Sequence, residues 1–513
     1  MRRLGLWVGH CKLSFATHDP VTNSIPNPPR VLRRVSNRTA AREPKAYSDV
    51  VLPGLGYKGG PVFPDCVSSL EKGKHSVMNS SEVTLKSPTE GIAAWVGLDW
   101  ADQQHVICLY EVKTGQSDIT RLEQKPEAFQ SWLSQLRERF GGAKVAIVLE
   151  QARGAVIYAL LGFDFVVLYP VNPQALASYR KAYAPSGAKS DPVDALLLME
   201  MVRHRPECFR PWKPDDADTR SLQLLTENRR QLVNQKTAFT NQLTSLLKSY
   251  YPQALELAGD LDSLQACDFL KKWPTLEALQ QARPSQIRKL YQDYGRPRPE
   301  QLEQRLEQIR RARPLTQDPA AVLSGSMMVE ALVEQIGSLI AAVGRFDQRI
   351  AALFRKHPDR FLFEGLPGAG AALAPRLLAA FGADRDRFQS AQQIQQLSGI
   401  APVTEQSGKQ RWVHWRWACS KFLRQSFHEF ADHSRKWCRW AKTLYQQLRR
   451  RGQGHHAAVR VLAFKWIRIL FHCWKTRTCY DESIYLKSLQ KRNPSLWADI
   501  QALPPRVRKQ PAA

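Results

Sequence analysis

Apolar and polar residues alternate along the chain in two different patterns. Between residues 93 and 171, short apolar runs are separated by polar turns. Runs of this length, rich in Val, Ile and aromatic residues, predict strands. The run at 143–150 is almost continuously apolar, which is typical of a strand buried on both faces. The runs are AAWVGLDW (93–100), HVICLYEV (105–112), AKVAIVLE (143–150) and FDFVVLYPV (163–171).

Two segments among these strands have helical spacing. PEAFQSWLSQLRERFG (126–141) is amphipathic, and SDPVDALLLMEMVRH (190–204) begins a second helix. The order is therefore a strand hairpin, a helix, a parallel strand, a helix, a strand and a helix. This order predicts a mixed α/β sheet of the ribonuclease H type over residues 91–212, with its first strand in the centre.

Longer helical periods follow over residues 213–358. Residues 220–250 carry leucines near heptad spacing, and residues 332–353 carry apolar residues in alternating steps of four and three. Such steps form an a/d seam and predict a helical coiled-coil region. The seam fits an intramolecular hairpin and a subunit interface equally well.

Residues 359–480 predict a mainly helical C-terminal domain. Its start, FEGLPGAGAALAPRLLAAFG, places a Leu-Pro-Gly-x-Gly turn between two helical stretches, as in a helix-hairpin-helix. Gly368 and Gly370 would let the backbone approach a phosphate at the start of the following helix. The alternative is a plain glycine-rich turn between packed helices.

The two ends of the chain show no core pattern. Residues 1–90 are rich in Pro, Ser, Asn and Arg, which predicts a disordered basic extension. Met78 is an alternative start, with the preceding residues an upstream in-frame translation. Residues 481–513 are expected to form a basic tail.

The balance of charge is strongly basic: 74 Lys and Arg oppose 47 Asp and Glu, for a net charge of +27. Residues 409–513 hold 23 basic and 5 acidic residues, so the excess gathers at the C-terminus. A polyanionic partner is expected, nucleic acid or an anionic membrane, and the position of the excess on residues that also look folded helps to choose nucleic acid. No run of 18 apolar residues is present, so a spanning helix is not expected. Seven tryptophans lie between 412 and 474, and most of these rings are expected in the core. The cations singled out for nucleic-acid binding are Arg411, Arg416, Lys421 and Arg424.

Four carboxylates lie where apolar runs end. Asp99 follows the first strand, Glu150 follows the buried strand, and Asp191 and Asp194 lie three residues apart at the start of a helix. Because site crevices form at strand ends of α/β sheets, we expect the four to meet. Carboxylates gathered in this way repel one another unless protons or divalent cations hold them, and oxygen ligands suit Mg²⁺ or Mn²⁺.

Each carboxylate also has a structural interpretation. Asp191 before Pro192 fits a helix N-cap, and Asp194 favours the helix dipole. Glu150 could pair with Arg153, and Asp102 rivals Asp99. The four together, in an order that brings them to one crevice, favour the metal site.

VGLDWADQQH, VLEQARG and KSDPVDA resemble the Asp-Glu-Asp-Asp motifs of the DEDD transposases of bacterial insertion sequences, the insertion sequence one-ten family. Downstream, LPGAGAALAPRLLAAFG, FQSAQQIQQLSGIAPVTEQSGKQ and KFLRQSF resemble that family's C-terminal transposase domain. The resemblance spans roughly residues 92–475. Where many relatives read Lys-Arg-Gly before a Leu-Arg pair, this chain has Cys419-Ser420-Lys421-Phe422 before Leu423-Arg424.

The resemblance implies a RuvC-like domain, a coiled-coil linker and a C-terminal domain with a nucleophilic serine. Ser407, in Gln406-Ser407-Gly408, takes that role, with Ser420 as the second candidate. Asp99, Glu150, Asp191 and Asp194 take the metal positions. The resemblance further implies DNA recombination guided by a structured bridge RNA, in a homo-oligomer, dimer or tetramer, of the bacterial cytoplasm and nucleoid.

The expected chemistry is metal-dependent DNA strand exchange through a phosphoserine. A RuvC-like structure-selective endonuclease that acts by hydrolysis is the first alternative. A nucleic-acid-binding protein without catalysis is the second.

Overall fold

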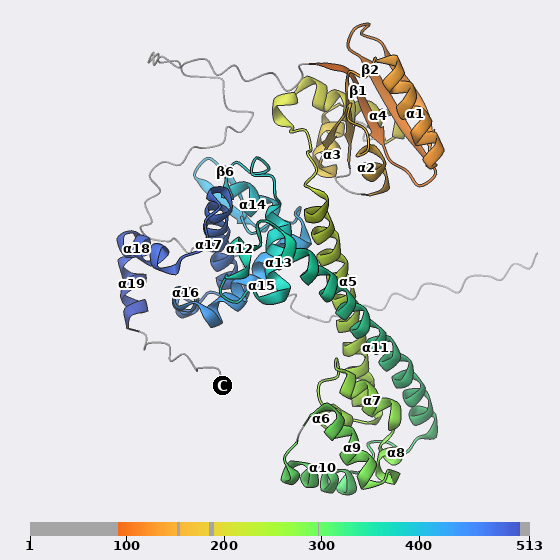
Figure 1. Ribbon diagram of the computed structural model, residues 1–513, viewed down its shortest axis with the longest axis vertical. Coiled ribbons are helices and arrows are strands. Elements are labelled where there is room, and N and C mark those ends of the chain that lie inside the picture. The colour runs from red at the N-terminus through yellow and green to blue at the C-terminus, as the bar shows by residue number, and fades with distance from the viewer. Residues whose placement is uncertain (1–90, 151–153, 184–188, 296, 503–513) are drawn as a thin grey trace, which may run out of the picture. The chain divides into compact units, whose positions relative to one another are not determined.

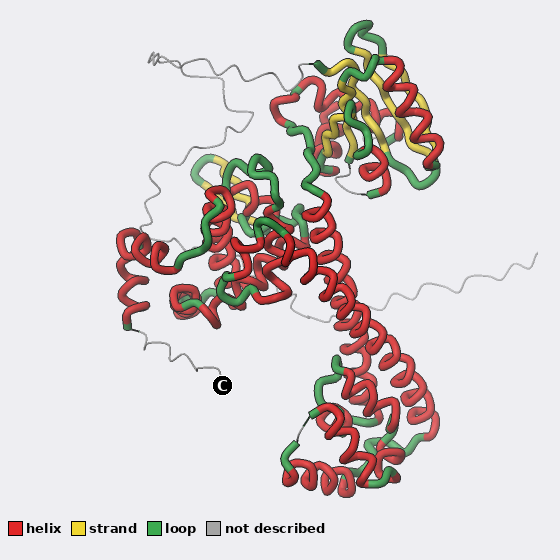
Figure 2. The backbone as a smooth tube through the Cα atoms, in the orientation of Figure 1, coloured by secondary structure: helices red, strands yellow, loops and turns green. Residues whose placement is uncertain are grey.

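The computed structural model describes residues 91–150, 154–183, 189–295 and 297–502 (Figure 1). The predicted N-terminal extension, residues 1–90, lies outside the described residues, as do Arg153 and the last part of the predicted tail. Figure 2 shows strands in the first domain and in one later hairpin, with helices elsewhere. The predicted fold class, an α/β sheet domain followed by a mainly helical region, is confirmed at this level.

The first domain contains one five-stranded sheet in the order β3-β2-β1-β4-β5. β1 lies in the centre, as predicted, antiparallel to β2 and parallel to β4, which is parallel to β5. The strands are β1 (Ile92–Asp99), β2 (Gln104–Glu111), β3 (Ser117–Glu123), β4 (Lys144–Leu149) and β5 (Val166–Pro170).

Alternation along β1 separates the two faces of this sheet. Val96 and Leu98 pack with α1 (Pro126–Arg139) and α2 (Ala155–Leu160). Trp95, on the other face, packs with residues of α3 (Pro173–Tyr183) and α4 (Asp191–His204). Because side chains alternate along a strand, Asp99 belongs to the face that α4 covers.

Two elements of this domain were not predicted, β3 and α3, whereas a helix at the position of α2, between β4 and β5, was predicted from the element order without bounds. β3 is an edge strand that pairs with β2 and buries only Leu122, so it lacks the apolar run of a core strand. α2 is only six residues long, which is too short to show a helical period.

α4 lies unusually close to β1 at Gly97. A Cβ atom built at Gly97 would lie 1.9 Å from the carbonyl oxygen of Ala195 and 2.8 Å from the backbone nitrogen of Met199. The missing side chain therefore lets the helix backbone rest directly on the strand. This contact fixes the first turns of α4 against the end of β1.

We expect Gly97→Ala to destabilise the first domain by about 3 kcal/mol, because the helix backbone must move to admit one methyl group. Urea unfolding measures the change. Gly337→Ala is the matched control, since that helical position faces open space and the substitution is expected to stabilise by up to about 1 kcal/mol. Equal stabilities of the Gly97 variant and the parent would contradict the packing argument.

α5 (Ala217–Tyr250) and α11 (Pro319–Lys356) are the two long helices predicted from the heptads, and they pack against each other within one chain. Arg229 of α5 donates to Asp347 of α11 through Nε and Nη2, at 2.5 and 3.0 Å. Of the two arrangements expected for the apolar seam, the structure therefore shows the intramolecular helix pair. Between them lie five helices: α6 (Ala254–Leu257), α7 (Leu264–Lys272), α8 (Leu276–Gln281), α9 (Pro284–Tyr294) and α10 (Pro299–Arg311).

Among the described helices, only α11 has the length and apolar composition to cross a bilayer. Its Leu332, Val333 and Ile336 are buried in the core shared with α5 and α7. These contacts are those of a core helix in a folded domain.

The C-terminal region has one apolar core and a small hairpin. Leu489, Leu496 and Ile500 are buried in that core, so the predicted basic tail is folded as two helices up to residue 501. The elements are α12 (Arg360–Glu364), α13 (Gly370–Phe381), α14 (Ala391–Leu397), β6 (Val403–Ser407), β7 (Gln410–His414), α15 (Lys421–Trp437), α16 (Arg439–Arg450), α17 (His455–Thr476), α18 (Glu482–Arg492) and α19 (Pro494–Gln501).

Candidate active site

Asp99 and Glu150 lie at the same end of two neighbouring parallel strands. Leu98 of β1 pairs in register with Leu149 of β4, and each carboxylate is the next residue along its strand. Residues in register point to the same side of a sheet, so both side chains belong to the face covered by α4. A half-buried Asp99 and a half-buried Glu150 therefore share one corner.

Asp191 and Asp194 occupy the first turn of α4. Asp191 is exposed, whereas Asp194 is buried. Ser190 precedes the helix as its N-cap, without a side-chain capping hydrogen bond. Asp191 itself is therefore not the cap, and the structural interpretation of that residue fails. Asp102 lies exposed in the turn between β1 and β2.

The four carboxylates act on one another electrostatically. Burial, and then the negative charges of Asp194, Asp191 and Glu150, raise the pKa of Asp99 from 3.8 to about 6, and Lys189 offsets part of the rise. The strand ends and the first turn of α4 bring Asp194, Asp191 and Glu150 near enough to Asp99 to act on its pKa, and their common role as a metal site stays a prediction. Negative charge gathers here without an equal positive charge beside it.

Arg180 of α3 is a site residue that the sequence did not reveal. Its Nε donates to Oδ1 of Asp194 at 2.5 Å, and the Asp194 side chain is only 2% exposed. A buried carboxylate needs such a partner. No pattern around Arg180 marks it, because the pair forms only when α3 packs beside α4.

We expect Arg180→Gln to lower the free energy of unfolding by about 3 kcal/mol, because Asp194 would keep a buried charge without compensation. Urea unfolding checks this. The matched control is Arg137→Gln, which breaks the exposed pair with Asp164 and is expected to cost no more than about 1 kcal/mol. Similar losses in the two variants would refute a special role for the buried pair.

A divalent cation fits this corner by its donor chemistry. Asp99, Glu150 and Asp191 offer hard oxygen ligands, and one oxygen of Asp194 is already engaged by Arg180. Burial is the main cause of the raised pKa of Asp99, and repulsion from the neighbouring carboxylates, which a cation would relieve, adds to it. In the arrangement described, no group of three His, Cys, Asp or Glu side chains is closed around a metal position.

Ser407 lies at the end of β6, next to the turn at Gly408, whose φ is +57°. Its side chain is exposed, and it pairs in register with Gln410 of β7. Trp412 pairs with Glu405 and so shares the face of Ser407, whereas Arg411 pairs with Gln406 on the other face. Ser407 and Arg411, both predicted site residues, therefore point away from each other.

Ser420, the second candidate serine, has a structural role. It is the N-cap of α15, and its hydroxyl accepts a hydrogen bond from the backbone nitrogen of Leu423 at 3.3 Å. This contact explains the residue without catalysis.

The two glycines of the predicted helix-hairpin-helix differ. Both have positive φ, +84° for Gly368 and +56° for Gly370. A Cβ at Gly368 would meet Trp437 and the backbone of His433, so this position is needed for packing on α15. Gly370 is exposed, begins α13 and faces open space, so it alone has the room for a close ligand.

The four predicted nucleic-acid cations also separate into two kinds. Arg411 and Lys421 are exposed. Arg416 donates to the carbonyl oxygens of Ala401 and Pro402, and Arg424 donates to that of Arg416. Their guanidinium groups hold the chain between β7 and α15 in place.

The prediction that most of the seven tryptophans lie in the core is wrong, because three of them are buried and Trp415 is half-buried. Trp440, Trp466 and Trp474 are fully buried, whereas Trp412, Trp417 and Trp437 are exposed.

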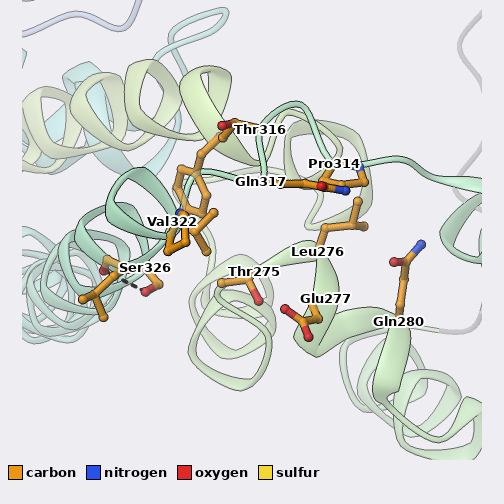
Figure 3. Close-up of a pocket in the computed structure, with 12 residues that line it drawn as sticks. Thr275, Leu276, Glu277, Gln280, Pro314, Thr316, Gln317, Val322 and Ser326 are labelled. Atoms are coloured by element: carbon orange, nitrogen blue, oxygen red, sulfur yellow. Dashed lines mark hydrogen bonds between the residues drawn. The ribbon is translucent and has the colours of Figure 1, made fainter.

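A cavity of about 750 Å³ lies among α8, α11 and the end of α5 (Figure 3). It contains none of the predicted site residues, and its one carboxylate, Glu277, has no second beside it among the lining residues. The lining residues are Tyr250, Thr275, Leu276, Glu277, Gln280, Pro314, Thr316, Gln317, Pro319, Val322, Leu323 and Ser326.

Comparison with known proteins finds one family match over the first domain and another over the C-terminal region. Residues 96–252 match a DEDD transposase family, and residues 361–446 match the family described as Transposase IS116/IS110/IS902. The IS117 mini-circle protein of Streptomyces coelicolor is 28% identical over 400 residues, which are 77% of this chain and 96% of that protein. The 42 kDa protein of insertion element IS900 from Mycobacterium paratuberculosis is 23% identical, over 75% of this chain and 96% of its own.

These matches define the class: the chain is a transposase of an insertion sequence, and hence an enzyme. The first match contains all four carboxylates, and the second contains Ser407 and Ser420. The chain belongs to the IS110 family of DEDD transposases, and the resemblance noted in the sequence is confirmed.

Proposed function

We propose that this transposase cleaves and rejoins DNA through a RuvC-like DEDD site and a serine nucleophile. The observation that supports the proposal is the raised pKa of Asp99, which follows first from burial and then from the nearby negative charges of Asp194, Asp191 and Glu150. A corner with this excess of negative charge is suited to divalent cations and, through them, to phosphates.

Asp99, Glu150 and Asp191 would hold Mg²⁺ or Mn²⁺, with Asp194 fixed by Arg180 beside them. Bound there, the ion supplies Lewis-acid polarisation of a phosphoryl oxygen and stabilises a leaving oxygen. The chain itself contributes the placement: β1 and β4 present two carboxylates side by side, and α4 presents the others.

Ser407 is the proposed nucleophile. Its hydroxyl oxygen forms a bond to phosphorus, and the bond from phosphorus to one sugar oxygen breaks. The serine proton passes to a carboxylate or to water, and the sugar oxygen takes up a proton. Attack on the phosphoserine by a hydroxyl of another strand reverses these steps and rejoins the DNA.

A guide RNA and an oligomer belong to the same proposal. The resemblance to the family supports both, and the basic excess after residue 409 suits a second polyanion besides DNA. The site of action would be the bacterial cytoplasm and its nucleoid. Sequencing of RNA that co-purifies with the protein tests this part: one structured RNA with segments matching target and donor DNA supports guidance, and random cellular RNA contradicts it.

Trapping the protein on end-labelled DNA, with and without Mg²⁺, tests the mechanism. A covalent protein–DNA adduct that forms only with Mg²⁺ is the expected result. Cleaved DNA without an adduct would instead indicate the hydrolytic endonuclease. Bound but uncut DNA under both conditions would indicate a binding protein without catalysis.

A further inference from the structure

Trp415, in the segment between β7 and α15, lies against two guanidinium groups. The Cζ atom of Arg460, on α17, is 3.6 Å from the centre of the indole ring, and that of Arg424, on α15, is 4.7 Å from it. Two cations on one ring attract the ring but repel each other. An arrangement of this kind is favourable when an anion neutralises it.

No carboxylate of the described residues forms an ion pair with either cation. Among the described residues, Arg424 donates only to the carbonyl oxygen of Arg416, and Arg460 has no hydrogen bond. The Nε atoms of both are buried without an acceptor. Burial and the neighbouring charge of Arg424 lower the pKa of Arg460. An unpaired, partly buried guanidinium is costly, so this cluster favours an anionic partner.

The groups around the pair add no negative charge at hydrogen-bond distance. One turn further along α15 lies His428, whose ring stacks 5.5 Å from that of His456, one turn before Arg460 on α17. Burial lowers the pKa of His428. Of the two carboxylates on α15, Asp432 is paired with Arg435 at 2.7 Å, and Glu429 is paired with Arg376 and Arg230.

A large exposed ring adjoins Trp415, the ring that carries the two cations. Trp417 is 80% exposed, and its ring centre lies 6.2 Å from that of Trp415. Exposure of so much indole surface is costly in water, and an exposed indole beside cations is the arrangement that binds a nucleobase next to its phosphate.

We infer that Arg460, Arg424 and Trp417 bind one nucleotide of an unpaired strand, with the phosphate at the two guanidinium groups and the base on Trp417. An unpaired strand is favoured because only unstacked bases offer a whole face to an indole. The inference rests on the proposed function in taking nucleic acid as the ligand, and it adds a subsite that neither the carboxylates nor Ser407 requires.

Binding of a labelled single-stranded oligonucleotide of about ten nucleotides, measured by fluorescence anisotropy on the full chain, tests the subsite. We expect Arg460→Gln to weaken binding about tenfold, and Trp417→Ala about five- to twentyfold, with Trp417→Phe retaining most of the affinity. Arg451→Gln, an exposed arginine just after α16, removes the same charge and should weaken binding less than about threefold.

Loss of affinity in Arg460→Gln no greater than in Arg451→Gln would overturn the inference, as would full binding by Trp417→Ala. Displacement of the oligonucleotide by inorganic phosphate, with no effect of Trp417→Ala, would indicate a simple anion site and also overturn it. Thermal unfolding of each variant shows that the fold is kept, and Arg460→Lys, which restores the charge, should recover part of the affinity. Because the readout is binding without Mg²⁺, absence of cleavage by the parent would contradict the proposed function and leave this result standing.

Discussion

Asp99→Asn is expected to reduce DNA cleavage by roughly a thousandfold, because it removes the central charge of the corner that binds the cations. Gel assay of labelled DNA with Mg²⁺ measures the loss. Asp102→Asn is the matched control: this aspartate lies three residues away, exposed in the β1–β2 turn, and its loss should leave cleavage within about twofold. Cleavage by the Asp99 variant at the parent's rate would remove the carboxylate site from the mechanism.

The same substitution should stabilise the protein at high pH. The folded state holds the pKa of Asp99 at about 6, above its ordinary value of 3.8, so the folded state binds this proton more tightly than the unfolded one. Stability from this group is therefore present below pH ~4 and is lost as the pH rises through about 6. At pH 8 without metal, Asp99→Asn should raise stability by on the order of 1 kcal/mol, after allowance for solvent screening, with no gain at pH 4.

Added Mg²⁺ should make the parent more stable than the Asp99→Asn variant at pH 8. Binding to the folded parent raises its melting temperature, whereas the Asp99 variant should gain much less. Thermal unfolding at pH 8 with and without Mg²⁺ measures the difference. An equal gain for both proteins would show that the ion binds elsewhere.

Ser407→Ala is expected to abolish the covalent protein–DNA adduct while DNA binding stays within about twofold. The side chain is exposed at a hairpin turn, so its removal should change stability by no more than about 0.5 kcal/mol. Denaturing gels of labelled DNA after incubation with Mg²⁺ give the readout.

Ser420→Ala supplies the control for that experiment. Loss of the cap of α15 should cost about 1 kcal/mol of stability, yet the adduct should still form. Persistence of the adduct in Ser407→Ala, together with its loss in Ser420→Ala, would reassign the nucleophile.

Much of the first domain was predictable because each of its core strands is a compact apolar run. β1, β2, β4 and β5 coincide closely with the runs quoted from the sequence, and the long helices α5 and α11 coincide with the heptad segments. Strand β3 was missed because six of its seven residues are exposed, so its sequence lacks the apolar residues of a core strand. A period of two appears in a sequence only where one face of a strand is buried.

Part of the candidate site was also predictable from the sequence, and part was not. The sequence by itself determined that four carboxylates stand at two strand ends and one helix start, because apolar runs that end in acids are visible without coordinates. Only the tertiary structure decided that Asp194 is bound by Arg180, that Gly97 lets α4 rest on β1, and that Arg460 meets Arg424 across Trp415. Those contacts join residues of different elements, and their energies depend on distance and burial, which the order of residues along a chain does not contain.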